Sequence, residues 1–310
     1  MKKRKIKKNL FYVIIIVICA IIFGITSIKN YMYKQTDEYK FISLGYSEEE
    51  TDFLLEYEEK TEYFIELGYS ENLIDILNQR YYIDEFLESY LSYSQEFVDL
   101  DTKDVITAIN IGIDKEFYTE TQLTDSSLGN LMLLNKFNYL PEDYVPEVVS
   151  IPLTYAYDDN YLTQDAKDAY VNMASAALSE GIQLIAFSTY RSYEEQETLY
   201  NRYKTSYGLA FAEEYSARAG FSEHQTGLAV DITTPGYSMD TFDESDSYSW
   251  LISNCYKYGY ILRYPENSEH LTGYSYESWH YRYVGVDVAT KIYNEGITFD
   301  EYYAYYINNN

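Results

Sequence analysis

This chain of 310 residues has three histidines, and two of them stand in surroundings that could do chemistry. His224 is followed by Asp231, and His280 is preceded by Glu277. Two imidazoles and one carboxylate suit Zn²⁺, and three protein ligands leave the open fourth position that a catalytic water needs. A further carboxylate there could take a proton from the attacking water and pass it to a leaving amine. A histidine near an aspartate is more often a core or surface residue, so the spacing alone does not establish a site.

The elements around these residues indicate an α+β fold. The apolar run 228–232 predicts a strand whose alternating side chains turn Asp231 to one face, and the loop before it could return His224 to that face. Residues 163–180 predict a helix that Gly181 ends. We also expect strands over 182–189 and 281–286, and helices over 194–203 and 250–258. Helices and strands are interspersed without a parallel βαβ rhythm, which favours α+β.

Four separated motifs in this region resemble the VanY-type D-alanyl-D-alanine carboxypeptidases, which are zinc peptidases. The pattern Ser-x-His-x-x-Gly-x-Ala-x-Asp occupies 222–231, and Glu-x-x-His occupies 277–280. Tyr-Arg-Ser over 190–192, followed by Gln196, and the segment from Asn135 to Pro146 match as well. The resemblance covers roughly 128–288. It implies a hedgehog/DD-peptidase-like domain with a central antiparallel sheet and flanking helices.

The resemblance also implies a role for each matching residue. It makes His224, Asp231 and His280 the zinc ligands and Glu277 the catalytic base. Arg191 falls where the family places a cation over the substrate, where its guanidinium could pair with a peptide carboxylate or stabilise an oxyanion.

Other polar residues lie in or near these motifs. Gln196 and Ser222 are possible hydrogen-bond partners of the substrate, or equally a helix-surface amide and a loop cap. We expect His270 to be a loop residue rather than a ligand. We expect Arg263 to pair with an acidic neighbour and Cys255 to be buried and inert.

The charge distribution separates the first residues from the rest of the chain. The chain carries 50 acidic and 23 basic side chains, a net charge of -27, which argues against nucleic acid as a partner. Residues 1–9 are strongly basic, and the uncharged stretch 10–28 is long enough for a transmembrane helix. By the positive-inside rule we expect a cytoplasmic N-terminus and an extracytoplasmic remainder. A cleaved signal peptide is the rival interpretation.

A repeat follows the apolar stretch. Leu-Gly-Tyr-Ser-Glu occurs at 44–48 and again at 67–71, each time before an apolar pattern of helical period. A serine in each copy could cap the following helix. We therefore expect 29–127 to form an acidic helical stalk and 128–310 to form the catalytic domain. The alternative role of the repeat region is binding of a partner.

The resemblance implies a zinc carboxypeptidase that acts on the bacterial cell wall, and the N-terminal segment predicts that it is anchored in the membrane. Its expected reaction is removal of the terminal D-alanine from peptidoglycan stem peptides. An L,D-carboxypeptidase, an endopeptidase and a non-catalytic wall-binding protein are the alternatives. An intact Glu277 disfavours the last, because a binding module needs no base.

Overall fold

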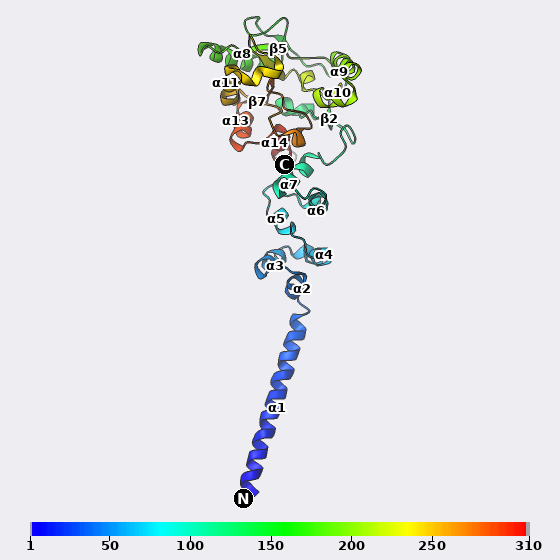
Figure 1. The fold of residues 1–310 in the computed structure, drawn as a ribbon, viewed down its shortest axis with the longest axis vertical. Helices are drawn as coiled ribbons and strands as arrows, with labels where there is room; N and C mark the ends of the chain where they lie inside the picture. Colours follow the sequence, from blue (N-terminus) through cyan, green and yellow to red (C-terminus); the bar gives the residue numbers. More distant parts are fainter. Residues whose placement is uncertain (1, 308–310) are drawn as a thin grey trace. The chain divides into compact units, whose positions relative to one another are not determined.

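The computed structural model describes the backbone of residues 2–307 and the side chains of residues 11–307. The chain forms two compact units, residues 1–82 and 83–310, which are described separately (Figure 1). Helices α6 (Leu87–Glu96) and α7 (Thr102–Ile111) belong to the second unit. The boundary at 127/128 stays a prediction.

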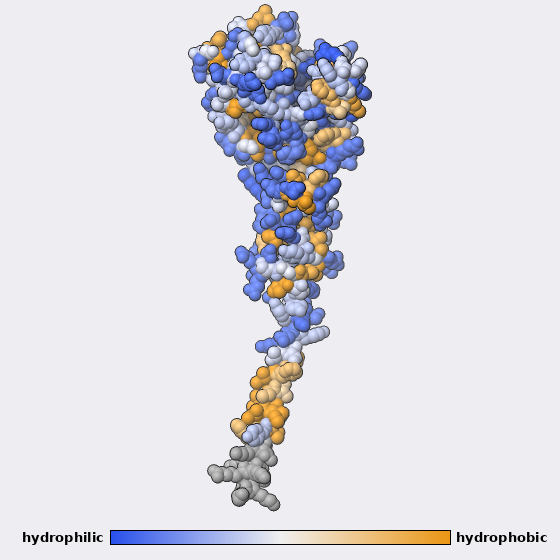
Figure 2. All heavy atoms as spheres, viewed as in Figure 1, coloured by the Kyte–Doolittle hydropathy of each residue, from blue (hydrophilic) through white to orange (hydrophobic). Residues whose placement is uncertain are grey.

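The first unit begins with the long helix α1 (Lys2–Tyr33). Its part from Phe11 to Tyr33 is long and apolar enough to cross a membrane. The large apolar side chains of this part are exposed in the structure. Figure 2 shows the hydrophobic colouring of this part of the helix. The side chains of the basic segment 1–9 lie outside the side chains that the structure describes.

The two copies of the repeat contact each other in the rest of this unit. The elements are α2 (Asp37–Leu44), α3 (Glu48–Leu55), η1 (Glu58–Lys60), α4 (Thr61–Leu67) and α5 (Leu73–Leu77). Ser47 caps α3 in a capping box with Glu50. Ser70 does not cap α5: its backbone N–H donates to the hydroxyl of Tyr46, 3.0 Å away, and α5 begins later, at Leu73. The first copy therefore uses its tyrosine to hold the second.

A four-stranded antiparallel sheet lies at the centre of the second unit, as expected. Its strand order is β5 (Ile185–Ser188), β6 (Ala229–Thr233), β8 (His280–Tyr283) and β7 (Tyr260–Leu262). The remaining helices are η2 (Asp84–Phe86), η3 (Ser126–Leu131), α8 (Gln164–Ser179), α9 (Tyr193–Tyr207), α10 (Leu209–Tyr215), η4 (Glu223–Thr226), η5 (Met239–Glu244), α11 (Asp246–Asn254), η6 (Cys255–Tyr258), α12 (Glu269–Thr272), α13 (Val286–Glu295) and α14 (Phe299–Tyr306). Two small sheets pair β1 (Gln122–Leu123) with β2 (Asn138–Tyr139) and β3 (Val149–Ser150) with β4 (Tyr161–Leu162).

Strand alternation gives the central sheet one apolar and one charged face. Val230, Ile232 and Tyr281 join the core that α8 and α11 cover. Because successive side chains of a strand point to opposite faces, Asp231 and His280 turn away from this core. The sequence thus places its chemistry on the face that α8 does not cover.

Some boundaries differ from those expected. The helix expected at 250 begins at Asp246, because the side chain of Ser245 accepts the backbone N–H of Tyr248 and caps it there. The strand expected to reach 286 ends at Tyr283, and α13 follows Gly285, whose φ of 86° turns the chain.

Candidate metal centre

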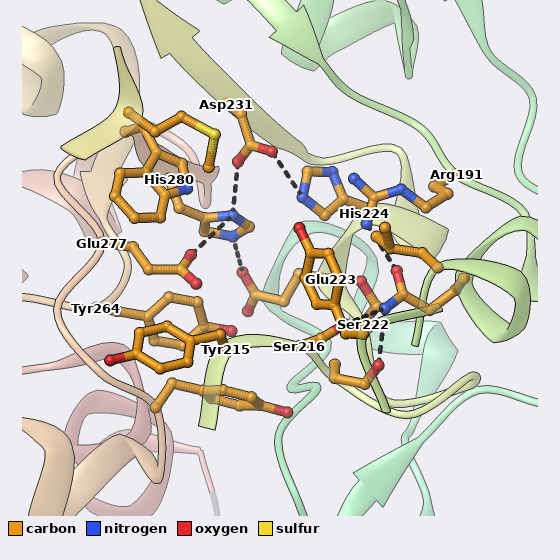
Figure 3. Close-up of a pocket in the computed structure, with 17 residues that line it drawn as sticks. Arg191, Tyr215, Ser216, Ser222, Glu223, His224, Asp231, Tyr264, Glu277 and His280 are labelled. Atoms are coloured by element: carbon orange, nitrogen blue, oxygen red, sulfur yellow. Dashed lines mark hydrogen bonds and ion pairs between the residues drawn. The ribbon is translucent and has the colours of Figure 1, made fainter. Parts of the chain in front are cut away.

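Asp231 lies between the two histidines (Figure 3). It is paired directly with His280 in the register of β6 and β8. Its Oδ1 lies 3.0 Å from Nδ1 of His280, and its Oδ2 lies 3.3 Å from Nε2 of His224. All three side chains are buried, and one ligand atom from each lies within 4.8 Å of the others. The structure therefore brings together the three residues that the sequence suggested as ligands.

A tight turn delivers His224 to this face. His224 lies on η4, and Gly227 ends η4 in the left-handed region with a φ of 69°. A Cβ atom on Gly227 would lie 2.9 Å from Cγ1 of Val148, so both the backbone angle and the close packing require glycine. The turn sets the imidazole of His224 against the residue that follows β5, because its Nδ1 lies 2.6 Å from the carbonyl oxygen of Thr189.

The hydrogen bonds of the two imidazoles fit a metal ion. Since a carbonyl oxygen only accepts, Nδ1 of His224 carries the proton and Nε2 offers its lone pair toward Asp231. Nε2 of His280 lies 3.4 Å from Oε2 of Glu223, an acceptor that leaves Nδ1 as the ligand atom. Each of the three residues offers one ligand atom, and these atoms lie close enough together for a single ion to contact all three.

Glu277 reaches the same place from the loop before β8. Its Oε2 lies 3.7 Å from Nδ1 of His280. The backbone N–H of Glu277 donates to the carbonyl of Tyr264, which ties this loop to the end of β7. Burial raises the pKa of Glu277 to about 7, and the negative charge of Asp231 adds to this rise while His280 opposes it. A carboxylate with a raised pKa beside a ligand cluster is suited to proton transfer.

Arg191 lies just after β5, on the side of His224 that faces away from Asp231 (Figure 3). Its guanidinium donates to Oε1 of Gln196 and to Oγ of Ser188, both at 2.7 Å. These partners are neutral, so the positive charge is held in place without being cancelled by a bound carboxylate.

Gln196 and Ser222 both line the pocket around these residues, and both are buried. Gln196 is not a helix-surface amide, because its amide group also donates to the carbonyl of Ala217, 2.7 Å away. It therefore orients Arg191. The pocket wall is otherwise rich in aromatic side chains, which are Tyr203, Tyr215, Tyr264, Tyr274 and Trp279.

Sequence reasoning missed Glu223. This residue is fully buried directly before His224, and its carboxylate faces His280 and two buried arginines, Arg263 and Arg282. The sequence signal that could have identified Glu223 is its position inside the motif, between Ser222 and His224. Arg263 does pair with acidic neighbours, as expected.

The remaining histidine and cysteine outside the membrane-length helix take no part in the cluster. His270 is exposed on α12. Cys255 is buried, as expected, and burial raises the pKa of its thiol to about 12.

Comparisons with known proteins agree with this geometry. Residues 159–286 match the VanY family, described as D-alanyl-D-alanine carboxypeptidase. A D-alanyl-D-alanine carboxypeptidase of Enterococcus faecalis (strain ATCC 700802 / V583) is 36% identical over 196 residues, which cover 59% of this chain and 69% of the relative. Among the curated relatives, the matched share of their own length ranges from 58% to 95%.

Two solved structures are similar to more than half of this chain. The LdcB LD-carboxypeptidase is 36% identical with a TM-score of 0.57, over 62% of this chain and 92% of that one. A mutant of the D,D-pentapeptidase VanY from a VanB-type resistance cassette, in complex with Zn(II), is also 36% identical with a TM-score of 0.50, over 56% and 98%. On these matches and the geometry of the centre, the chain belongs to the VanY family of D-alanyl-D-alanine carboxypeptidases.

Proposed function

We propose that this protein is a zinc D,D-carboxypeptidase that removes the terminal D-alanine from peptidoglycan stem peptides. The observation that carries the proposal is the convergence of Nε2 of His224, the carboxylate of Asp231 and Nδ1 of His280, with Glu277 beside them. Family membership and the Zn(II) complex of the similar VanY structure support it.

The three proposed ligands would hold one Zn²⁺ ion. Zinc bound there supplies a Lewis acid that polarises the scissile carbonyl and makes water more acidic. His224 and His280 present one lone pair each, and their other nitrogens face acceptors that fix the ring orientation. Asp231 adds the negative charge that makes the site selective for a cation.

Glu277 acts as the general base. In its ionised form it takes a proton from the attacking water, and in its protonated form it gives that proton to the leaving amine. Burial raises its pKa to about 7, so one carboxyl can perform both transfers near neutral pH.

Arg191 binds the free carboxylate that defines a carboxypeptidase substrate. Its guanidinium is held by Gln196 and Ser188 and has no competing carboxylate partner among the described side chains. A fixed guanidinium is suited to pair with a planar carboxylate. Ser222 and the aromatic wall complete the pocket and contact the rest of the peptide.

We also propose a single-pass membrane protein with an extracytoplasmic catalytic domain. The basic segment 1–9 would stay in the cytoplasm, the segment 10–28 would cross the membrane, and 29–127 would act as a stalk for the domain 128–310. The helix from Phe11 to Tyr33 and the basic residues before it support this arrangement.

Product analysis tests the proposed reaction. The full-length protein is loaded with zinc in detergent and incubated separately with a stem pentapeptide and a stem tetrapeptide. The masses of the products are measured by mass spectrometry. Loss of one alanine from the pentapeptide alone supports the D,D activity. Loss from the tetrapeptide would instead indicate an L,D-carboxypeptidase, the activity in the name of the similar LdcB structure. No change in either would favour an endopeptidase or a binding role.

A further inference from the structure

A cluster of four charged side chains lies buried directly behind His280. Glu223, Arg263, Arg282 and Asp300 are each at most 1% exposed. The two carboxylates and two guanidiniums balance in charge, which is the condition for burying such groups at tolerable cost. Of the four, Glu223 lines the pocket of the proposed site, whereas Arg263, Arg282 and Asp300 do not.

The two oxygens of Glu223 have different partners. Oε1 accepts from Nε of Arg263 at 2.7 Å and from a guanidinium nitrogen of Arg282 at 2.8 Å. Oε2 is left facing Nε2 of His280 at 3.4 Å. One oxygen therefore fixes the carboxylate, and the other meets the imidazole.

The arginines are themselves immobilised. Arg263 donates to Oδ2 of Asp300 on α14 and to the carbonyl of Leu134. Arg282 donates to the carbonyls of Asn130 and Met132. Because these anchors come from well-separated segments of the second unit, Glu223 cannot turn away from His280 without breaking the cluster.

We propose that Glu223 is a positioning residue that orients His280 for metal binding. This inference rests on the proposed zinc site. Its carboxylate accepts the Nε2 proton of His280, which directs the Nδ1 lone pair to the metal and strengthens it as a ligand. Arg263 and Arg282 hold Glu223 in that position. Carboxylates in such outer positions typically contribute about 10- to 100-fold to metal affinity or activity.

A purely structural role is the alternative, in which the cluster only joins β7, β8 and α14. Asp300 gives a matched control, because Asp300→Asn removes one negative charge from the same buried cluster without touching His280. Glu223→Gln removes one negative charge as well, but at the contact with His280. A charge-balanced variant, Glu223→Gln combined with Arg282→Gln, keeps the test valid where the single variant is too unstable to fold.

The experiment measures zinc affinity by competition with a chelator and the visible spectrum of the Co²⁺-substituted full-length protein. Thermal unfolding of the metal-free proteins is measured alongside. We expect both Glu223 variants to lose about 10- to 100-fold in zinc affinity and to shift the Co²⁺ spectrum. We expect Asp300→Asn to lower the unfolding temperature while its zinc affinity and spectrum stay like those of the wild type.

Two results would overturn the proposal. One is a charge-balanced variant with the zinc affinity and Co²⁺ spectrum of the wild type. The other is an equal loss of zinc affinity in Asp300→Asn, which would assign the effect to the cluster as a whole. Neither readout requires turnover, so a wild-type protein that binds zinc but hydrolyses no stem peptide would refute the proposed function and leave this test intact.

Discussion

Oε2 of Glu277 lies 3.7 Å from Nδ1 of His280, the same nitrogen that faces Asp231. The two residues are three positions apart, and a turn in which the N–H of His280 donates to the carbonyl of Glu277 brings them to one face. The proposed base is therefore positioned by the start of the strand that carries a proposed ligand. A substitution of either residue therefore changes the surroundings of the same nitrogen atom, Nδ1 of His280.

His224→Ala is expected to lose the metal. Removing one of three ligands leaves a site too weak to keep zinc at micromolar concentration. Zinc per chain after gel filtration, measured by atomic absorption, should fall from about one to near zero. His270→Ala, at the exposed histidine on α12, should keep its zinc and serves as the control. Full zinc content in His224→Ala would remove His224 from the ligand set.

Arg191→Lys tests recognition of the substrate carboxylate. A lysine keeps the charge but loses the fork that Gln196 and Ser188 hold, so we expect KM to rise roughly tenfold or more with a smaller change in kcat. Arg202→Lys, on the exposed part of α9, should leave both constants unchanged. A fall in kcat at constant KM would instead place the guanidinium at the oxyanion.

The pH dependence of kcat/KM follows from Glu277. Burial raises its pKa from 4.5 to about 7, while bound zinc adds positive charge that lowers it. The base must be ionised, so kcat/KM should rise with pH along an acid limb whose midpoint lies between 4.5 and about 7. A pH–rate profile with excess zinc checks this. A rate that falls as pH increases across this interval would contradict the role of Glu277.

Lys136 gives a pH-dependent term in stability. Burial lowers its pKa to about 8, although the ammonium lies over the rings of Phe117 and Tyr274 and donates to the carbonyl of Glu213. Below pH 8 both the folded and unfolded states are protonated, and the folded state bears the full cost of burying the cation. Between about 8 and 10.5 only the unfolded state holds the proton, so stability increases with pH.

Comparison with Lys136→Met isolates this term. The free energy of unfolding of the wild type, minus that of the variant, should grow by about 1.4 kcal/mol per pH unit above pH 8. Urea unfolding at two pH values within the interval measures it. The ionisation of tyrosines largely cancels in the difference. A difference that is constant with pH would show that Lys136 is not perturbed.

The sequence predicted the parts of the site that depend on local pattern. The alternation of 228–232 placed Asp231 opposite the core, and the histidine and glutamate motifs identified the residues that converge. The role of β7 and the buried partners Arg282 and Asp300 were not predicted, because their contacts join segments far apart in the chain. A serine could be identified as a cap at Ser47, but the sequence did not show that the helix after Ser70 begins only at Leu73, with Asn72 as its N-cap residue.

The same limit applies to Glu223. The sequence shows that Glu223 precedes His224. Its role depends on Arg263, directly after β7, and on Arg282, on β8. Long-range pairing of buried charges has no signature in the spacing of a single sequence. The site could be proposed from motifs, whereas its support required the fold.

Glu277→Gln tests the central claim most directly, because the variant keeps the shape of the side chain and removes only its ability to accept a proton. Zinc content and release of D-alanine from a stem pentapeptide are measured on the same preparation, with the exposed Glu269→Gln as control. The account predicts one zinc per chain in every protein and a fall in turnover of about 10²- to 10⁴-fold in Glu277→Gln alone. Turnover close to that of the wild type in Glu277→Gln would contradict it.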